Sequence, residues 1–218
     1  MDNMQCCGIE RFFDGKEADK DFAAYRKKGP VKTTRMLIDA LKADGVQGST
    51  LLDIGGGVGA IQHELLKAGA SSAVSIEAAT AYIEAARVEA DRQGVADRLV
   101  HRHGDFVAMA KELEQADIVT LDRVVCCYDD MEGLVGLSLE KARGLYALVY
   151  PRDTWPARVV LWFANIYYRL RRCPFRIFLH STAAIDRLVR SHGFELKFHQ
   201  KTRIWHVAVY GRAGSPAS

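Results

Sequence analysis

The sequence predicts an α/β fold built on a seven-stranded, mostly parallel sheet with helices on both faces. From about residue 50 to residue 150, short apolar runs alternate with longer amphipathic segments, the pattern of parallel strands joined by crossover helices. The 218 residues suit one such domain with an insertion. A domain of this size buries about 70% of the surface that its unfolded chain exposes.

Seven short apolar runs are the expected strands. Five fall within the alternating part of the chain, and the last two look like a C-terminal antiparallel pair because each has alternating apolar residues. In chain order the expected strands are residues 51–54, 73–76, 99–103, 117–121, 145–149, 194–198 and 204–210.

The segments between these strands have the composition and periodicity of helices. Gly69 and Gly94 stand where a left-handed C-cap would end the helices that precede them. The expected helices are residues 60–67, 80–93, 131–142 and 181–191.

Two further helices, broken by Gly29 and Pro30, are expected before the first strand. They are residues 22–28 and residues 31–43, and the second has its apolar side chains on one stripe. We expect both to lie over the open end of the sheet. The expected organisation is a helical cap (1–45), a main domain (46–212) and a disordered tail (213–218).

Composition and charge argue against several classes of protein. The 30 Lys and Arg residues exceed the 27 Asp and Glu residues by only three, too little to indicate a nucleic-acid partner. The N-terminal residues lack the basic start and apolar core of a secretory signal, and no apolar run reaches the ~18 residues that span a bilayer. We expect a cytoplasmic protein with reduced thiols at its five cysteines, Cys6, Cys7, Cys126, Cys127 and Cys173.

A glycine-rich string, LLDIGGGVGA, joins the first strand to its helix. It places Asp53, Gly55, Gly57 and Gly59 where glycines let the backbone approach a ligand closely, which is typical of a nucleotide-binding turn. With Ala60 the spacing also fits the G-x-G-x-x-G/A motif of dinucleotide folds. A nicotinamide-dependent oxidoreductase therefore remains an alternative at this point.

An acidic residue followed by G-x-G-x-G resembles the first motif of the class I S-adenosylmethionine (SAM) dependent methyltransferases, and Asp53, Gly55, Gly57 and Gly59 match it position by position. The resemblance covers about residues 50–212. It implies a Rossmann-like sheet with an antiparallel last strand, SAM as cofactor and S-adenosylhomocysteine as product.

The same resemblance implies roles for residues at the ends of later strands. Glu77 would bind the ribose hydroxyls, Asp105 would contact the adenine amino group, and Phe106 would pack on the ring. Asp122 would line the methyl-transfer pocket. Asp105 and the antiparallel C-terminal pair argue against the oxidoreductase, for which Glu77 would serve equally well.

Among subfamilies the chain looks most like the magnesium-protoporphyrin O-methyltransferase group. The likeness rests on the N-terminal helices that lead through residues 42–45 to the glycine loop, and on the segment after Asp122. Cys126 and Cys127 stand where that group has a histidine, which argues against a porphyrin acceptor.

Candidate catalytic residues come from three parts of the chain. Arg123 and Tyr128 would orient the acceptor, His180 would act as a general base, and Tyr25 would reach the active centre from the cap. Each has a structural alternative, since Arg123 can pair with a neighbouring Asp, both tyrosines can pack, and His180 can lie on the surface. His101, His103 and Asp105 make only a weak metal site, and we expect no metal.

A helical insertion, residues 154–179, follows the fifth strand and contains an amphipathic helix over residues 155–172. Its apolar stripe roofs an acceptor pocket, lies in a membrane interface as a peripheral contact, or docks on the core. The stripe is Val159, Trp162, Phe163, Ile166 and Leu170, opposite Arg158, Asn165, Arg169 and Arg172.

The sequence therefore predicts a SAM-dependent methyltransferase that acts, at oxygen, on a small, partly apolar acceptor. Methyl transfer from a sulfonium mainly needs alignment and exclusion of water. If Cys6, Cys7 and Cys173 approached Cys126 and Cys127, a thiol or trivalent arsenic acceptor would be an alternative. A second alternative is a protein that binds SAM without catalysing methyl transfer. The sequence does not indicate the oligomeric state.

Overall fold

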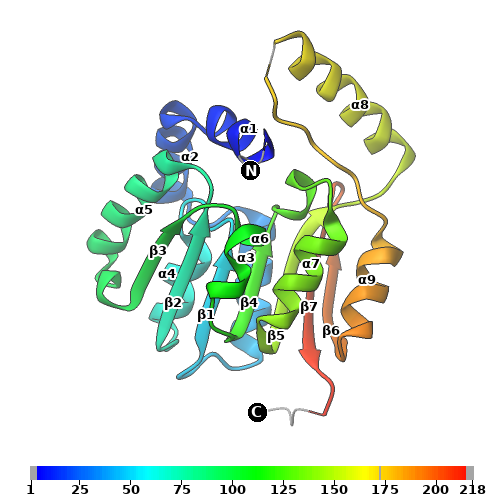
Figure 1. Ribbon diagram of the computed structural model, residues 1–218. Coiled ribbons are helices and arrows are strands. Elements are labelled where there is room, and N and C mark those ends of the chain that lie inside the picture. Colours follow the sequence, from blue (N-terminus) through cyan, green and yellow to red (C-terminus); the bar gives the residue numbers. More distant parts are fainter. Residues whose placement is uncertain (1–3, 172, 215–218) are drawn as a thin grey trace.

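The computed structural model describes residues 4–171 and 173–214, which form a central sheet with helices on both faces (Figure 1). The strand order is β3-β2-β1-β4-β5-β7-β6, and β7 runs antiparallel to both of its neighbours. The strands are β1 (Thr50–Ile54), β2 (Ser72–Glu77), β3 (Leu99–His103), β4 (Ala116–Asp122), β5 (Ala142–Pro151), β6 (Phe194–Lys201) and β7 (Trp205–Arg212). The predicted Rossmann-like, mostly parallel sheet with its antiparallel last strand is confirmed.

Helices and short 3-10 turns connect the strands. The α-helices are α1 (Met4–Phe12), α2 (Gly15–Lys28), α3 (Lys32–Ala43), α4 (Ala60–Lys67), α5 (Thr80–Gln93), α6 (Phe106–Met109), α7 (Met131–Glu140), α8 (Trp155–Leu170) and α9 (Thr182–Ser191). The 3-10 turns are η1 (Ala96–Arg98), η2 (Ala110–Glu112) and η3 (Val125–Cys127).

Two apolar cores lie on the two faces of the sheet. On one face α6, α7 and α9 pack over the side chains of Leu52 and Ile54, and on the other α3, α4 and the end of α5 pack over Leu51. Successive residues of β1 thus enter opposite cores, as the pleat of a strand requires. Parallel strands covered on both faces leave only their ends open, and the ligand crevice of such sheets lies at the carboxyl ends.

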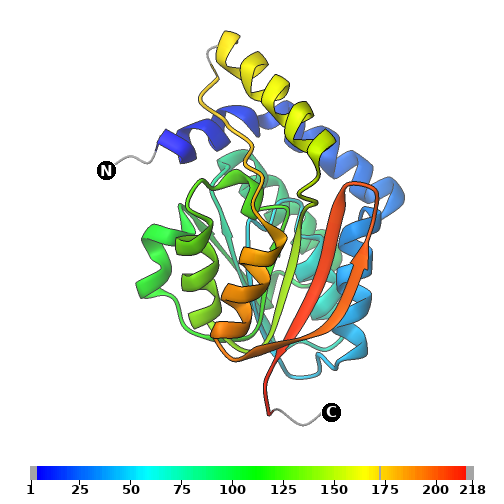
Figure 2. The ribbon, with the colours of Figure 1, turned by 90° about the vertical axis from the view of Figure 1, so that its right-hand side faces the viewer.

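The N-terminal helices differ from the expectation in two ways. α1 and the first two turns of α2 were not predicted, although Asp14 caps α2 by accepting hydrogen bonds from the backbone of Lys16 and Glu17. The placement of residues 31–43 over the open end was wrong, because the apolar stripe of α3 packs against α4, β5 and β7. Of the three N-terminal helices, α1 and α2 lie above the carboxyl ends of the strands (Figures 1 and 2).

The insertion after β5 stands out from the body of the protein. In Figure 2, α8 projects above the sheet, and the segment that follows it descends to α9. No residue of α8 is buried. Within the described ranges, no helix has both the length and the apolar character needed to cross a membrane. Of the tail predicted to be disordered, residues 215–218 lie outside the described residues.

Candidate active site

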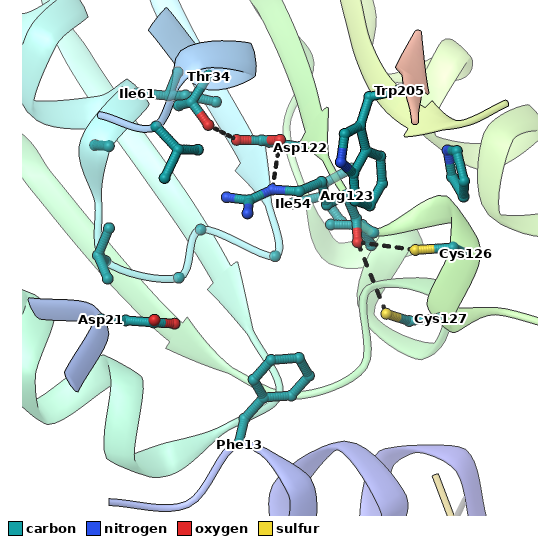
Figure 3. A pocket seen from close by; sticks show the side chains of 18 of the residues that line it. Phe13, Asp21, Thr34, Ile54, Ile61, Asp122, Arg123, Cys126, Cys127 and Trp205 are labelled. Atoms are coloured by element: carbon teal, nitrogen blue, oxygen red, sulfur yellow. Dashed lines mark hydrogen bonds and ion pairs between the residues drawn. The ribbon is translucent and has the colours of Figure 1, made fainter. Parts of the chain in front are cut away.

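A cavity of about 1060 Å³ lies between the carboxyl ends of the strands and the overlying helices α1, α2 and α8. We call its two parts the donor end and the acceptor end. The donor end consists of the glycine loop (residues 53–59), Glu77 and the start of α5. The acceptor end consists of η3, the end of β5, the turn between β6 and β7, and α8 with the segment after it. Figure 3 shows the region where they meet.

The glycine loop adopts backbone conformations that favour glycine. Gly55, Gly57 and Gly59 have φ values of 69°, 52° and 78°. A side chain at Gly55 would also clash, because its Cβ would lie 2.3 Å from Val124 Cγ2. At Gly59 a Cβ would lie 2.6 Å from His63 Cε1. Glycine at these positions lets the loop lie directly on α4 and on the segment that follows β4.

Glu77 ends β2 and holds the glycine loop. Its Oε2 accepts a hydrogen bond from the Gly57 amide at 2.9 Å, and its Oε1 accepts one from the Ala79 amide at 2.9 Å. Burial raises the pKa of this carboxyl, and the backbone hydrogen bonds oppose that shift. Each oxygen of an ionised carboxylate has a second lone pair, so Glu77 can still accept hydrogen bonds from ligand hydroxyls.

Asp53 lies beneath the same loop and is only 1% exposed. Its carboxylate accepts hydrogen bonds from Gln62 Nε2 at 2.9 Å and Thr120 Oγ1 at 2.6 Å. Burial raises the pKa of Asp53 to about 7, although both hydrogen bonds lower it. The geometry makes Asp53 a support that joins β1 to β4 and α4.

A buried polar cluster ties the cap to the loop. Tyr25 Oη lies 3.3 Å from His63 Nδ1, and Gln93 Nε2 donates to Tyr25 Oη at 3.3 Å. His63 is fully buried, and its Nε2, on the side of Gly59, has no hydrogen-bond partner among the described residues. Burial lowers the pKa of His63 to about 4, so its ring is neutral at pH 7. Tyr25 lines the cavity, and its hydroxyl is directed toward His63, a residue that sequence analysis missed.

Asp122 and Arg123 stand where the donor and acceptor ends meet (Figure 3). Asp122 accepts a hydrogen bond from Thr34 of α3, and Arg123 Nε lies 3.1 Å from Asp122 Oδ1. Among the described residues, Arg123 is the one non-glycine residue with a positive φ, 64°. Such a conformation costs roughly 1–3 kcal/mol and persists where surrounding contacts enforce it. Here the Arg123 amide donates to the Val149 carbonyl at 2.8 Å.

Tyr128, Asp105 and His180 are brought together beside this junction. The Tyr128 hydroxyl donates to Asp105, which also caps α6 by accepting a hydrogen bond from the Val107 amide. His180 Nε2 lies 2.8 Å from the Tyr128 carbonyl oxygen and must donate to it. Tyr128 and Phe106 line the cavity, although Phe106 is 1% exposed, whereas Asp105 and His180 are not part of its wall.

Two thiols line the acceptor end. Cys126 and Cys127 both direct their sulfur atoms at the carbonyl oxygen of Arg123, at 3.4 and 3.8 Å (Figure 3). A hydrogen bond from the Cys127 thiol lowers the pKa of Cys126 and raises that of Cys127. Cys173 lies in the segment after α8, and the side chains of Cys6 and Cys7 lie outside the description. No group of three or more potential metal ligands is found within the described part of the chain.

Sequence analysis missed much of the acceptor end. Its walls are largely apolar and include Trp205, Ile204 and Phe175, together with Val160 and Leu161 of α8. Phe12 of α1 stacks on Phe175 with ring centroids 4.4 Å apart. Three arginines line the same end, namely Arg123, Arg152 and Arg203.

The sheet order, the left-handed glycine loop and the carboxylate at the end of β2 define the class as a Rossmann-like SAM-dependent methyltransferase. Residues 4–140, more than half of the chain, match the sequence profile of the O-methyltransferase domain family. The chain belongs to that family, whose methyl donor is SAM. This assignment favours methyl transfer over the nicotinamide-dependent alternative. No match was found among curated proteins.

Solved structures share the fold. The magnesium protoporphyrin IX methyltransferase of Synechocystis with bound SAH superposes with a TM-score of 0.76 at 17% identity, covering 96% of this chain and 100% of that one. An O-methyltransferase family protein from Burkholderia thailandensis gives 0.66 at 18% identity, covering 93% and 61%. An O-methyltransferase family 2 protein from Planctomyces limnophilus, in complex with apigenin, gives 0.65 at 16% identity, covering 91% and 62%. At these identities the likeness concerns the fold.

Proposed function

We propose that the chain transfers the methyl group of SAM to an oxygen atom of a small, partly apolar acceptor that carries a negative charge. The observation that carries this proposal is the continuity of the donor and acceptor ends within one cavity of about 1060 Å³. Ligand pockets usually enclose about 300–1,000 Å³, so this volume is enough for the donor and a small acceptor together.

The residues of the donor end fit SAM. The conformation of the glycine loop leaves its backbone at the cavity wall, and a Cβ at Gly57 would meet only one atom, at 4.0 Å. Glu77 would accept hydrogen bonds from the ribose hydroxyls. Bound SAM supplies an already activated methyl group on a cationic sulfonium. The carboxylate of Glu77 at the wall would favour a cation electrostatically, whereas that of Asp122 is paired with Arg123.

The acceptor end supports an anionic, partly apolar ligand. Trp205 and Phe175 offer flat apolar surfaces, and Arg123, Arg152 and Arg203 can orient an anionic oxygen through charge-assisted hydrogen bonds. The acids of the cavity wall belong to α2, the donor end or the junction: Asp21, Asp53, Glu77 and Asp122. An ionised oxygen needs no general base before it attacks the methyl group.

The remaining candidate residues would position the acceptor or the walls of the cavity. Tyr128 would hold the wall of the acceptor end against Asp105, and Arg123 would point an oxygen toward the donor end. His180 would support Tyr128 from outside the cavity, because its ring nitrogen donates to the Tyr128 carbonyl. Tyr25 would fix α2 over the glycine loop through His63.

The test is a methyl-transfer assay that measures S-adenosylhomocysteine release. Matched pairs of acceptors are compared, each an aromatic carboxylic acid or acidic phenol and its neutral analogue. We expect turnover of the anionic member, and Arg203→Gln should raise its KM about tenfold while the Kd for SAM stays unchanged. The matched control is Arg187→Gln, an exposed arginine on α9 outside the cavity. Equal turnover of the neutral analogues, unaffected by Arg203→Gln, would contradict the proposed acceptor class.

A further inference from the structure

The apolar face of α8 points away from the protein. Trp155, Phe163 and Leu170 are 77%, 61% and 80% exposed. Other large apolar residues that α8 exposes are Val159, Val160, Trp162 and Tyr167. Soluble proteins rarely leave so many large apolar side chains together on one element without a function for them.

The opposite face of α8 accounts for how the helix is attached. Asn165 makes two hydrogen bonds with the backbone of Ile177, donating at 2.8 Å and accepting at 3.0 Å. Ala157, Leu161 and Tyr168 share that side, at spacings of one to three helical turns. Sequence analysis had placed Asn165 with the outer arginines. The inward face therefore attaches the helix through Asn165, Leu161 and Tyr168, whose ring packs on Phe12 and Phe175. The apolar stripe has no partner among the described residues.

Charge indicates what covers this face. No Asp or Glu occurs from residue 154 to residue 185, whereas the same stretch contains Arg158, Arg169, Arg171, Arg172 and Arg176. Arg158, Arg169 and Arg171 are exposed, and Arg158 and Arg169 flank the apolar face on one side. Arg158 is paired with Asp153, just before the helix, so the uncompensated charge of this region comes mainly from Arg169 and Arg171. A second copy of this helix would bring the same positive charges and no counter-charge of its own, whereas the headgroups of anionic lipids supply one.

The side chains also suit a lipid surface. Helices that lie in the membrane interface combine Trp, Phe and Leu on one side with Lys or Arg at the polar boundary. Trp and Tyr are the residues that concentrate at the headgroup level. The 16 residues of α8 make a rod of about 24 Å, which can lie in the interface plane.

We propose that α8 docks the protein on the surface of an anionic phospholipid bilayer. The helix axis lies along the surface, the apolar face enters the boundary between headgroups and acyl chains, and Arg169 and Arg171 contact lipid phosphates. Pro156, Ala157, Val160 and Leu161 of the same helix line the acceptor end. The acceptor end would therefore lie next to the bilayer surface, where partly apolar acceptors accumulate. The docking itself requires no assumption about the acceptor.

The test is co-sedimentation of the full chain with vesicles of phosphatidylcholine alone and of phosphatidylcholine mixed with phosphatidylglycerol. We expect binding to the anionic vesicles only, weakened by salt. Phe163→Glu should lower the partition coefficient at least about tenfold, because it removes an inserted ring and adds a repelled charge. Arg169→Gln should weaken binding less. Both sites are exposed, so the fold should survive, and unchanged circular dichroism would confirm this.

The matched control is Val88→Glu, which changes a 60% exposed apolar residue on α5 and should leave vesicle binding unchanged. Three results would overturn the proposal. They are the absence of binding to anionic vesicles, equal binding to uncharged vesicles, and equal losses in Phe163→Glu and Val88→Glu. A concentration-dependent dimer that Phe163→Glu dissociates would also overturn it, because the face would then belong to a second copy.

Discussion

The donor end and the acceptor end are built in different ways. At the donor end, Glu77 and Asp53 come from adjacent parallel strands, are buried, and bond to the loop or to side chains beneath it. At the acceptor end, η3 and the end of β5 are joined by a turn, by α8 and by the segment after α8, and α8 has no buried residue. Rigid elements hold a site precisely, whereas exposed connections tolerate change. The difference suggests that the donor end fixes the reaction class and the acceptor end sets the acceptor.

The largest effect should come from a methyl group added at Gly55. Gly55→Ala introduces a Cβ that meets Val124 and also strains a φ of 69°. We expect SAM affinity to fall at least about 100-fold and stability to fall by about 3 kcal/mol, since both overpacking and backbone strain act there. Titration calorimetry and thermal unfolding measure the two quantities.

The Gly94→Ala variant measures the effect of backbone strain without a steric clash. Gly94 also has a φ of 69°, but a Cβ there would meet nothing within 4 Å. This variant should lose only about 1 kcal/mol of stability and keep SAM binding. Val124→Ala should partly rescue Gly55→Ala by removing the clashing methyl groups. Equal effects of Gly55→Ala and Gly94→Ala would show that close packing of the loop on Val124 is unimportant.

The buried carboxyl of Asp53 should change how the free energy of unfolding depends on pH. Its folded-state pKa is about 7, above the unfolded value of about 4. Between these values the folded protein holds a proton that the unfolded chain releases, so this group makes stability fall as pH rises from about 4 to about 7. His63, with a folded pKa of about 4, acts in the opposite direction up to its unfolded pKa of about 6.5.

Asp53→Asn should remove the contribution of Asp53 alone. Relative to the wild type, the variant should gain about 3 kcal/mol between pH 4 and pH 7, measured by urea denaturation at several pH values. Parallel pH profiles for the two proteins would mean that Asp53 is ionised across this range and that its burial is less complete than described.

A smaller effect is expected where the cap meets α5. Glu89 has a fully buried side chain. Its carboxylate forms an ion pair with Arg26 of α2 at 2.7 Å and accepts further hydrogen bonds from Arg92 and Gln93. Hydrogen bonds from Arg92, Gln93 and Arg26 lower the pKa of Glu89 to about 2, so its contribution is present above pH ~4.3 and is lost as pH falls toward 2. Glu89→Gln should cost about 1.5 kcal/mol at pH 7, because half-exposed arginines leave part of the pair screened.

Glu64→Gln is the matched control for Glu89→Gln. Glu64 pairs with Lys42 and Lys67 but is 30% exposed. Its loss should cost about 0.5 kcal/mol or less by chemical denaturation. A cost as large as that of Glu89→Gln would remove the distinction between a buried link of the cap and an ordinary surface pair.

The donor end could be predicted because its signals are local. The glycine loop is recognisable from a few adjacent residues. The position of Glu77 could be predicted because it is the last residue of the next strand. The cluster of Tyr25, His63 and Gln93 could not be predicted, since its members lie far apart in the chain and meet only through packing. The orientation of α8 could not be predicted from the sequence either. Amphipathic periodicity identifies two faces, but it does not say which one meets the protein.

The most direct test of the central claim is calorimetric titration with SAM, S-adenosylhomocysteine and NAD. The donor site described here predicts that the wild type binds SAM and S-adenosylhomocysteine but not NAD. Glu77→Ala should weaken the binding of SAM and of S-adenosylhomocysteine by about 2–3 kcal/mol, roughly 30- to 150-fold, as expected for the loss of hydrogen bonds to a charged group. Glu84→Ala, an exposed carboxylate on α5, should bind like the wild type. Binding of NAD without SAM, or unchanged SAM affinity in Glu77→Ala, would contradict the account.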